Sequence, residues 1–222
     1  GLGGARIERI KEENCWQIYP DPADELITKM AHQYPHELTL IATGPLTNLA
    51  LGLQKDLKGM RKLKEVAIMG GAVRTKGNIT PHAEFNIFVD PLAAKMVFES
   101  GLPITMVPLD VTHQVFLTPQ VIEGKVGPIN NSFSRFMIEA IGYDLTTHKF
   151  AGKELIYLHD PLVVGVVIDP NLVRIEQLSL DVETEEGEHY GQIKEVKEGA
   201  KVEVCLRADV KRFLELFLSR LK

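Results

Sequence analysis

The stretch LTLIATGPLTNLALGL, residues 38–53, contains a strand, a turn and a helix in direct succession. Residues 38–42 form a short apolar run, which is typical of a strand that is buried on both faces. Thr43, Gly44 and Pro45 then turn the chain, and the apolar side chains of residues 46–53 favour a helix. The stretch therefore predicts a buried strand that passes directly into a helix.

The same alternation continues along the chain. Residues 65–69 predict a strand that ends at Gly70 and Gly71, residues 90–98 predict a helix, and residues 104–109 predict the next strand. Strands and helices in alternation favour an α/β fold, with a mostly parallel sheet flanked by helices.

The C-terminal part adds further elements as an extension of this pattern. The expected segments are a helix over 130–141, a polar loop over 142–153, an apolar helix over 161–168, strands over 174–182 and 201–206, and an amphipathic helix over 209–222. We treat residues 1–222 as a single domain.

Composition excludes several classes of partner. The 222 residues are 45% hydrophobic and 25% charged, and the formal net charge of -5 argues against a nucleic-acid-binding surface. No apolar run reaches the length of a membrane span. Cys15 and Cys205 are far apart; a disulfide between them stays open, but two free thiols in a reducing cytoplasm is the interpretation that we favour.

Three polar segments follow predicted strands or begin a helix, where ligands of parallel sheets bind. The first, residues 43–48, holds a Gly-Pro turn that leaves backbone groups free to face a ligand. On local chemistry alone, a turn with a helix cap is the simpler interpretation.

The second segment contains Asn78 and the run Glu84-Phe85-Asn86. One carboxylate between two carboxamides can hold vicinal hydroxyl groups, because the carboxylate accepts hydrogen bonds and each amide both donates and accepts them. A solvated loop is an equally good interpretation at this point.

The third segment pairs His159 with Asp160 at the start of the apolar helix. Asp160 could cap that helix or bind a hard cation such as calcium, and His159 could act as a general acid because its ordinary pKa lies near neutrality. For an isolated dipeptide, a cap beside a hydrogen-bonded histidine is the simpler interpretation.

Taken together, these segments resemble the inosine-uridine-preferring nucleoside hydrolase family. The matching pieces, in the family's order and spacing, are residues 42–50, 65–71, 77–78, 83–87 with 90–91, 109–110 with 112–113, and 159–162; residues 1–4 resemble a piece that follows the family's third strand. The resemblance extends from Gly1 through the C-terminal helix, and no single motif decides it.

The resemblance implies a function. The chain would hydrolyse the N-glycosidic bond of ribonucleosides in purine or pyrimidine salvage, through an oxocarbenium-like transition state and a water positioned by calcium. It also implies a small-molecule nucleoside as substrate and a cytoplasmic homo-oligomer, a dimer or a tetramer.

The resemblance also assigns roles to residues. The Thr43 carbonyl and the Asp160 carboxylate would bind the calcium ion. The side chains of Asn78, Glu84 and Asn86 would hold the ribose hydroxyls, with Phe85 against the sugar. His159 would be the catalytic residue, because it would protonate the leaving base.

One departure from the family pattern matters. The family begins with a strand that ends in an Asp-x-Asp-x-x-x-Asp-Asp cluster, which supplies further calcium ligands, and this sequence contains no such cluster. The missing piece is then on another chain, or lost, or replaced through self-association. The alternative function is a truncated, inactive homologue that retains only the ribose-binding loops.

Overall fold

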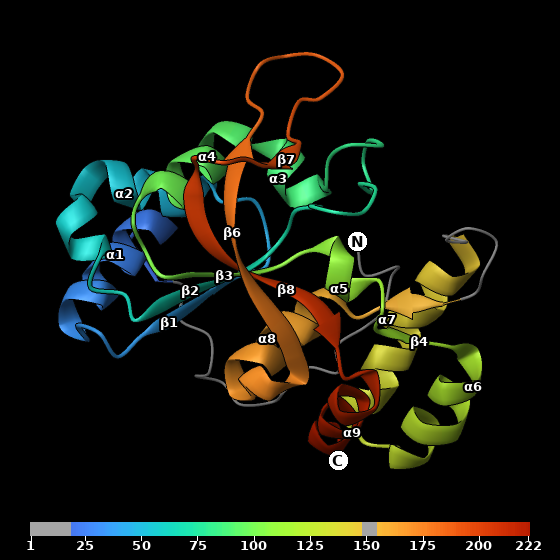
Figure 1. Ribbon diagram of the computed structural model, residues 1–222. Helices are drawn as coiled ribbons and strands as arrows, with labels where there is room; N and C mark the ends of the chain where they lie inside the picture. Colours follow the sequence, from blue (N-terminus) through green and yellow to red (C-terminus); the bar gives the residue numbers. More distant parts are fainter. Residues whose placement is uncertain (1–18, 148–154) are drawn as a thin grey trace.

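The computed structural model describes residues 19–147 and 155–222. Its centre is a six-stranded sheet in the order β1-β2-β3-β8-β6-β7, with a separate two-stranded sheet, β4-β5 (Figure 1). The strands are β1 (Thr39–Ala42), β2 (Glu65–Met69), β3 (Ile104–Val107), β4 (Phe116–Leu117), β5 (Ile156–Tyr157), β6 (Val173–Val182), β7 (Ile193–Glu195) and β8 (Ala200–Ala208).

The helices alternate with these strands. They are α1 (Ala23–Gln33), α2 (Thr47–Met60), α3 (Phe85–Val89), α4 (Pro91–Glu99), α5 (Leu109–Thr112), α6 (Pro119–Val121), α7 (Ser132–Thr147), α8 (His159–Ile168) and α9 (Val210–Arg220), with short helical turns at Ile122–Val126, Gly127–Ile129 and Pro170–Leu172.

The sheet is mixed: its first four strands in spatial order are parallel, and the last two are joined by antiparallel pairing. β1, β2, β3 and β8 pair in parallel, whereas β6 pairs antiparallel with both β8 and β7. The predicted mostly parallel sheet flanked by helices is therefore confirmed. The two strands predicted near the C-terminus, β6 and β8, belong to this same sheet. β8 pairs with β3, and β6 pairs with β8.

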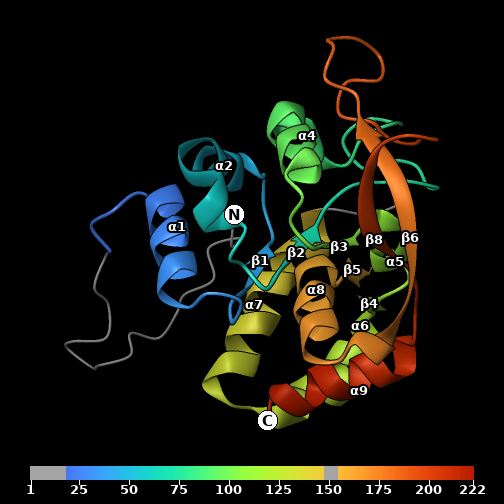
Figure 2. The same ribbon diagram turned by 60° about the vertical axis from the view of Figure 1, so that its left-hand side comes forward.

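Two apolar layers cover the sheet. Val66 and Ile68 of β2 pack with α2 and α4, whereas the alternate residues Ala67 and Met69 pack with α8 and α9. Figure 2 shows α2 and α4 on one face of the sheet and α8 on the other. Alternate side chains of β2 therefore pack into two different apolar cores, one on each face of the sheet, as expected of a strand with helices on both faces.

β1 differs from expectation. Its four residues are only half-buried, and it forms one edge of the sheet in the described part of the chain. A strand with a neighbour on one side only loses the cover that a second neighbour would give. The predicted burial on both faces is therefore incomplete at β1, whereas four of the five residues of β2 and all four of β3 are buried.

The region after residue 141 also differs. The expected loop over 142–153 is helical up to Thr147, where α7 ends, and residues 148–154 lie outside the described residues. A single glycine costs a helix only about 1 kcal/mol, so Gly142 does not end it.

None of the helices in the described residues combines the length and apolar character that a membrane span requires. Cys205 is a buried free thiol, and Cys15 lies outside the described residues.

Candidate functional site

The site lies where β1 and β2 end, at one rim of the sheet. Thr43 directly follows β1. Gly70 and Gly71 directly follow β2, the strand that pairs with β1. The side-chain amide of Asn86 joins the two strand ends, because its Nδ2 donates to the Met69 carbonyl at 3.0 Å and to the Thr43 carbonyl at 3.4 Å. Two of the predicted segments therefore meet at this rim.

Glu84 is held in one position by backbone donors. Its side chain caps α3 and accepts hydrogen bonds from the backbone N–H groups of Asn86 at 2.9 Å, Ile87 at 3.2 Å and Gly71 at 2.9 Å. Glu84 is only 2% exposed, and burial raises the pKa of its carboxyl group although the three N–H groups act in the opposite direction. The result is a fixed carboxylate with both oxygens oriented.

Asn78 and Phe85 lie at the outer side of this arrangement. Both are exposed, and the Asn78 Oδ1 accepts a hydrogen bond from the Phe85 N–H at 2.9 Å. The loop that carries Asn78 closes tightly, since a Cβ on Gly77 would lie 2.0 Å from the Ala83 carbonyl oxygen. Only glycine fits at position 77 in this loop conformation, which places Asn78 beside Phe85.

His159 opens α8 and is packed among polar and aromatic groups. Its Nδ1 lies 2.7 Å from the hydroxyl of the buried Thr112, and its ring centroid lies 5.4 Å from that of Tyr157 and 5.7 Å from that of His113. Burial, followed by the charge of His113, lowers the pKa of His159 to about 4. The ring is therefore neutral at pH 7, unlike a histidine with its ordinary pKa near neutrality.

Asp160 does not cap α8. The N-cap position is Leu158, which makes no side-chain cap, and Asp160 lies within the first turn, so the cap interpretation of Asp160 is wrong. In the described part of the chain its carboxylate has no hydrogen-bonding or ion-pair partner. Burial raises the pKa of the Asp160 carboxyl group, and the charge of Asp160 in turn raises the pKa of Glu84. The third predicted segment therefore lies near the second.

Two neighbouring groups had weaker sequence signals. Asp110, just after β3, accepts hydrogen bonds from the N–H groups of Val73 at 2.9 Å and Arg74 at 2.7 Å, and so holds the loop that follows Gly71. Tyr157 lies 4.7 Å from His113 between ring centroids. Tyr157 was missed in sequence, although its place two residues before His159 offered a signal.

The donor chemistry suits a hard cation, but the donor number is small. Carbonyl and carboxylate oxygens, from Thr43 and Asp160, are ligands that calcium prefers, and calcium takes six to eight of them. Residues 19–147 and 155–222 contain no group of three or more His, Cys, Asp or Glu side chains placed to hold a metal ion. The described residues therefore do not form a complete metal site.

Comparison with known proteins gives one consistent result. The family model described as inosine-uridine preferring nucleoside hydrolase matches residues 1–215. The pyrimidine-specific ribonucleoside hydrolase RihB of Shigella sonnei is 37% identical over 159 residues, which are 70% of this chain and 50% of that protein. The chain thus matches about half the length of this relative.

Solved structures of nucleoside hydrolases also resemble this chain. A plant nucleoside hydrolase superposes with a TM-score of 0.87 at 27% identity, over 99% of this chain and 71% of that one. The purine-preferring ribonucleoside hydrolase from Gardnerella vaginalis gives a TM-score of 0.84 at 30% identity, over 93% of this chain and 67% of that one.

Proposed function

Because the chain belongs to the inosine-uridine preferring nucleoside hydrolase family, we propose that it hydrolyses the N-glycosidic bond of ribonucleosides to free base and ribose. The observation that carries the proposal is the convergence of the Thr43 carbonyl, the Glu84 and Asn86 side chains and the Asp160 carboxylate at one rim of the sheet. Family membership suggests a metal cofactor, and we propose that this metal is calcium.

The ribose is held by side chains with unused hydrogen-bonding capacity. A carboxylate oxygen can accept two hydrogen bonds, and Glu84 Oε1 accepts one, from the Asn86 N–H. The Asn86 amide donates to two carbonyls, which leaves its Oδ1 to accept from a hydroxyl group. Asn78 uses its Oδ1 on Phe85 and keeps its NH₂ group for the sugar. The exposed Phe85 ring provides an apolar surface for the ribose.

His159 serves the leaving base. With the Thr112 hydroxyl donating to Nδ1, the ring proton lies on Nε2, which can then donate to a nitrogen of the base. The low pKa of His159 means that this donor is a neutral imidazole at pH 7. Such a donor assists departure of the base through a hydrogen bond as negative charge develops on it, while the sugar becomes oxocarbenium-like.

The Thr43 carbonyl and the Asp160 carboxylate are the proposed ligands of the calcium ion. A bound divalent cation lowers the pKa of a coordinated water molecule. Two protein oxygens fall short of the usual six to eight, so water molecules and substrate hydroxyls would have to supply further ligands.

A second candidate function follows from the small number of metal ligands. The chain would bind a nucleoside or ribose through Asn78, Glu84 and Asn86 without cleaving it. The absence of a three-residue metal cluster in the described residues favours this alternative.

Ribose release from uridine and inosine separates the two functions and also tests the base preference. We expect turnover in the presence of calcium, loss of turnover with a chelator, and loss in Asp160→Asn. Asp21→Asn, a matched change two residues before α1, should retain activity. Saturable nucleoside binding without any ribose release would support the non-catalytic alternative, and neither binding nor release would contradict both.

A further inference from the structure

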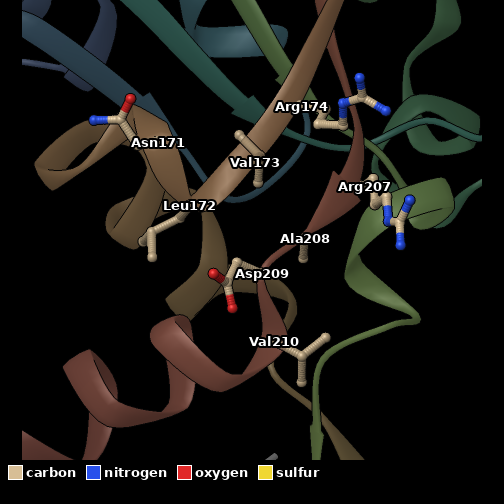
Figure 3. Close-up of a pocket in the computed structure, with 8 residues that line it drawn as sticks. All are labelled: Asn171, Leu172, Val173, Arg174, Arg207, Ala208, Asp209 and Val210. Atoms are coloured by element: carbon tan, nitrogen blue, oxygen red, sulfur yellow. The ribbon is translucent and has the colours of Figure 1, made fainter.

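A cleft lies beyond the C-terminal end of α8, at the opposite end of this helix from His159. It has a volume of about 600 Å³, and none of its lining residues belongs to the candidate site. The lining comes from the helical turn Pro170–Leu172 that follows α8, the start of β6, the end of β8 and the start of α9. The residues are Asn171, Leu172, Val173, Arg174, Arg207, Ala208, Asp209 and Val210 (Figure 3).

Two arginines dominate the chemistry of this cleft. Arg174 and Arg207 are directly opposite each other in the β6–β8 pairing, and both are exposed. Neither guanidinium group has a hydrogen-bonding or ion-pair partner among the described residues. Like charges directly opposite in a sheet destabilise it, and this pair occurs in a chain whose net charge is -5. An anion bound between the two would remove that repulsion.

A β-bulge lies beside the arginine pair, and hydrogen bonds hold the backbone around Arg207. Arg174 pairs with Arg207 but Ile175 pairs with Cys205, so Leu206 has no partner on β6. The Gln114 side chain compensates, because it donates to the Leu206 carbonyl at 2.9 Å and accepts from the Ala208 N–H at 3.1 Å. These bonds hold the backbone on both sides of Arg207. Bulges redirect side chains, and here the bulge lies next to the arginine pair.

The acidic residue of the cleft does not neutralise the arginines. Asp209 caps α9 by accepting a hydrogen bond from the Arg212 N–H at 3.1 Å. In Figure 3 both guanidinium groups extend to the same side of the strands, while the Asp209 carboxylate points to the other side. The two positive charges therefore remain available to a ligand.

We propose that this cleft binds a tetrahedral oxyanion, inorganic phosphate or the phosphate group of a phosphomonoester, between Arg174 and Arg207. The planar guanidinium group matches phosphate geometry and forms paired charge-assisted hydrogen bonds with it.

Titration calorimetry of the 222-residue chain tests the proposal, with inorganic phosphate, ribose 5-phosphate and ribose as separate probes at constant ionic strength. We expect saturable binding of at least one of the two phosphate compounds at the cleft. Ribose serves as the reference for binding at the candidate site, which does not involve the two arginines. Arg174→Gln and Arg207→Gln should each weaken that binding by about tenfold or more, the loss typical of one charge-assisted pair. Binding of only one phosphate compound would identify which form of the ligand the cleft accepts.

Arg220→Gln is the matched control, because Arg220 is an exposed arginine at the end of α9, outside the cleft. Phosphate-dependent thermal unfolding gives a second readout, since a ligand of the folded state raises its melting temperature. The proposal is overturned if neither phosphate compound binds saturably, if Arg174→Gln and Arg207→Gln weaken ribose binding as much as phosphate binding, or if Arg220→Gln weakens phosphate binding as much as the two cleft variants.

Discussion

Asn86→Asp is the most informative single substitution, because it changes one NH₂ group into an oxygen without changing the shape of the side chain. Asn86 is 8% exposed, and its NH₂ group donates to the Met69 and Thr43 carbonyls. In the variant a carboxylate oxygen would face these two carbonyl oxygens. It would also lie close to the Glu84 carboxylate, which binds the backbone N–H of the same residue.

The magnitude follows from these contacts. The bond to the Met69 carbonyl, at 3.0 Å between buried groups, contributes about 1 kcal/mol, and the longer bond to the exposed Thr43 contributes less. Repulsion between the new carboxylate and the carbonyl oxygens adds about 1–2 kcal/mol. We therefore expect the free energy of unfolding to fall by about 2–3 kcal/mol at pH 7.

The loss should depend on pH. Burial and nearby oxygens raise the folded-state pKa of the introduced carboxyl group above its unfolded value. Folding is then favoured by the protonated form, so the loss shrinks as the pH falls through the raised folded-state pKa. Urea unfolding of wild type and variant at pH 7 and pH 5 measures both effects.

Asn78→Asp is the matched control. Asn78 is exposed and its Oδ1 is an acceptor, a role that a carboxylate keeps. Its free energy of unfolding should change by less than about 0.5 kcal/mol. Equal losses in the two variants, or no loss in Asn86→Asp, would refute the conclusion that the Asn86 amide joins the ends of β1 and β2.

Three further predictions concern single positions. Gly77→Ala should lower the free energy of unfolding by about 1–3 kcal/mol, because its Cβ would meet the backbone at 2.0 Å, whereas Gly44→Ala, with no atom within 4 Å, should change it by less than about 0.5 kcal/mol; urea unfolding compares them. His159, with its pKa lowered from 6.5 to about 4, should stay neutral from pH 8 to pH 5 in an NMR titration, and its contribution to stability, complete above pH 6.5, should be lost as the pH falls from about 6.5 to about 4; a midpoint near 6.5 would contradict the burial argument. Burial raises the pKa of Cys205 to about 12, so in a Cys15→Ser background a thiol reagent should modify the chain only after unfolding, and rapid modification of the native chain would contradict this.

Local patterns were sufficient to predict much of the sheet and its helices. The buried runs of β2 and β3 and the amphipathic pattern of α9 depend on neighbours in sequence, and these elements appear near the expected residues. The half-buried state of β1 and the continuation of α7 through Gly142 depend on the order of the strands and on tertiary packing. No local pattern contains that information.

The candidate site was predictable in its residue types but not in its contacts. Residues 84–86 could be identified because they lie in a polar loop after a predicted strand, and His159-Asp160 because they begin a predicted apolar helix. The lowered pKa of His159 comes from burial and from His113, which is 46 positions away in sequence. The two hydrogen bonds from the Asn86 amide to the Thr43 and Met69 carbonyls likewise join segments that are distant in sequence, so only the folded chain reveals them.

A crystal structure of the chain with calcium and ribose tests the account most directly. We predict that the sugar hydroxyls lie within hydrogen-bonding distance of the side chains of Asn78, Glu84 and Asn86, and that the cation is bound by the Thr43 carbonyl and the Asp160 carboxylate. Ribose or calcium bound elsewhere, with this rim of the sheet occupied only by solvent, would contradict it.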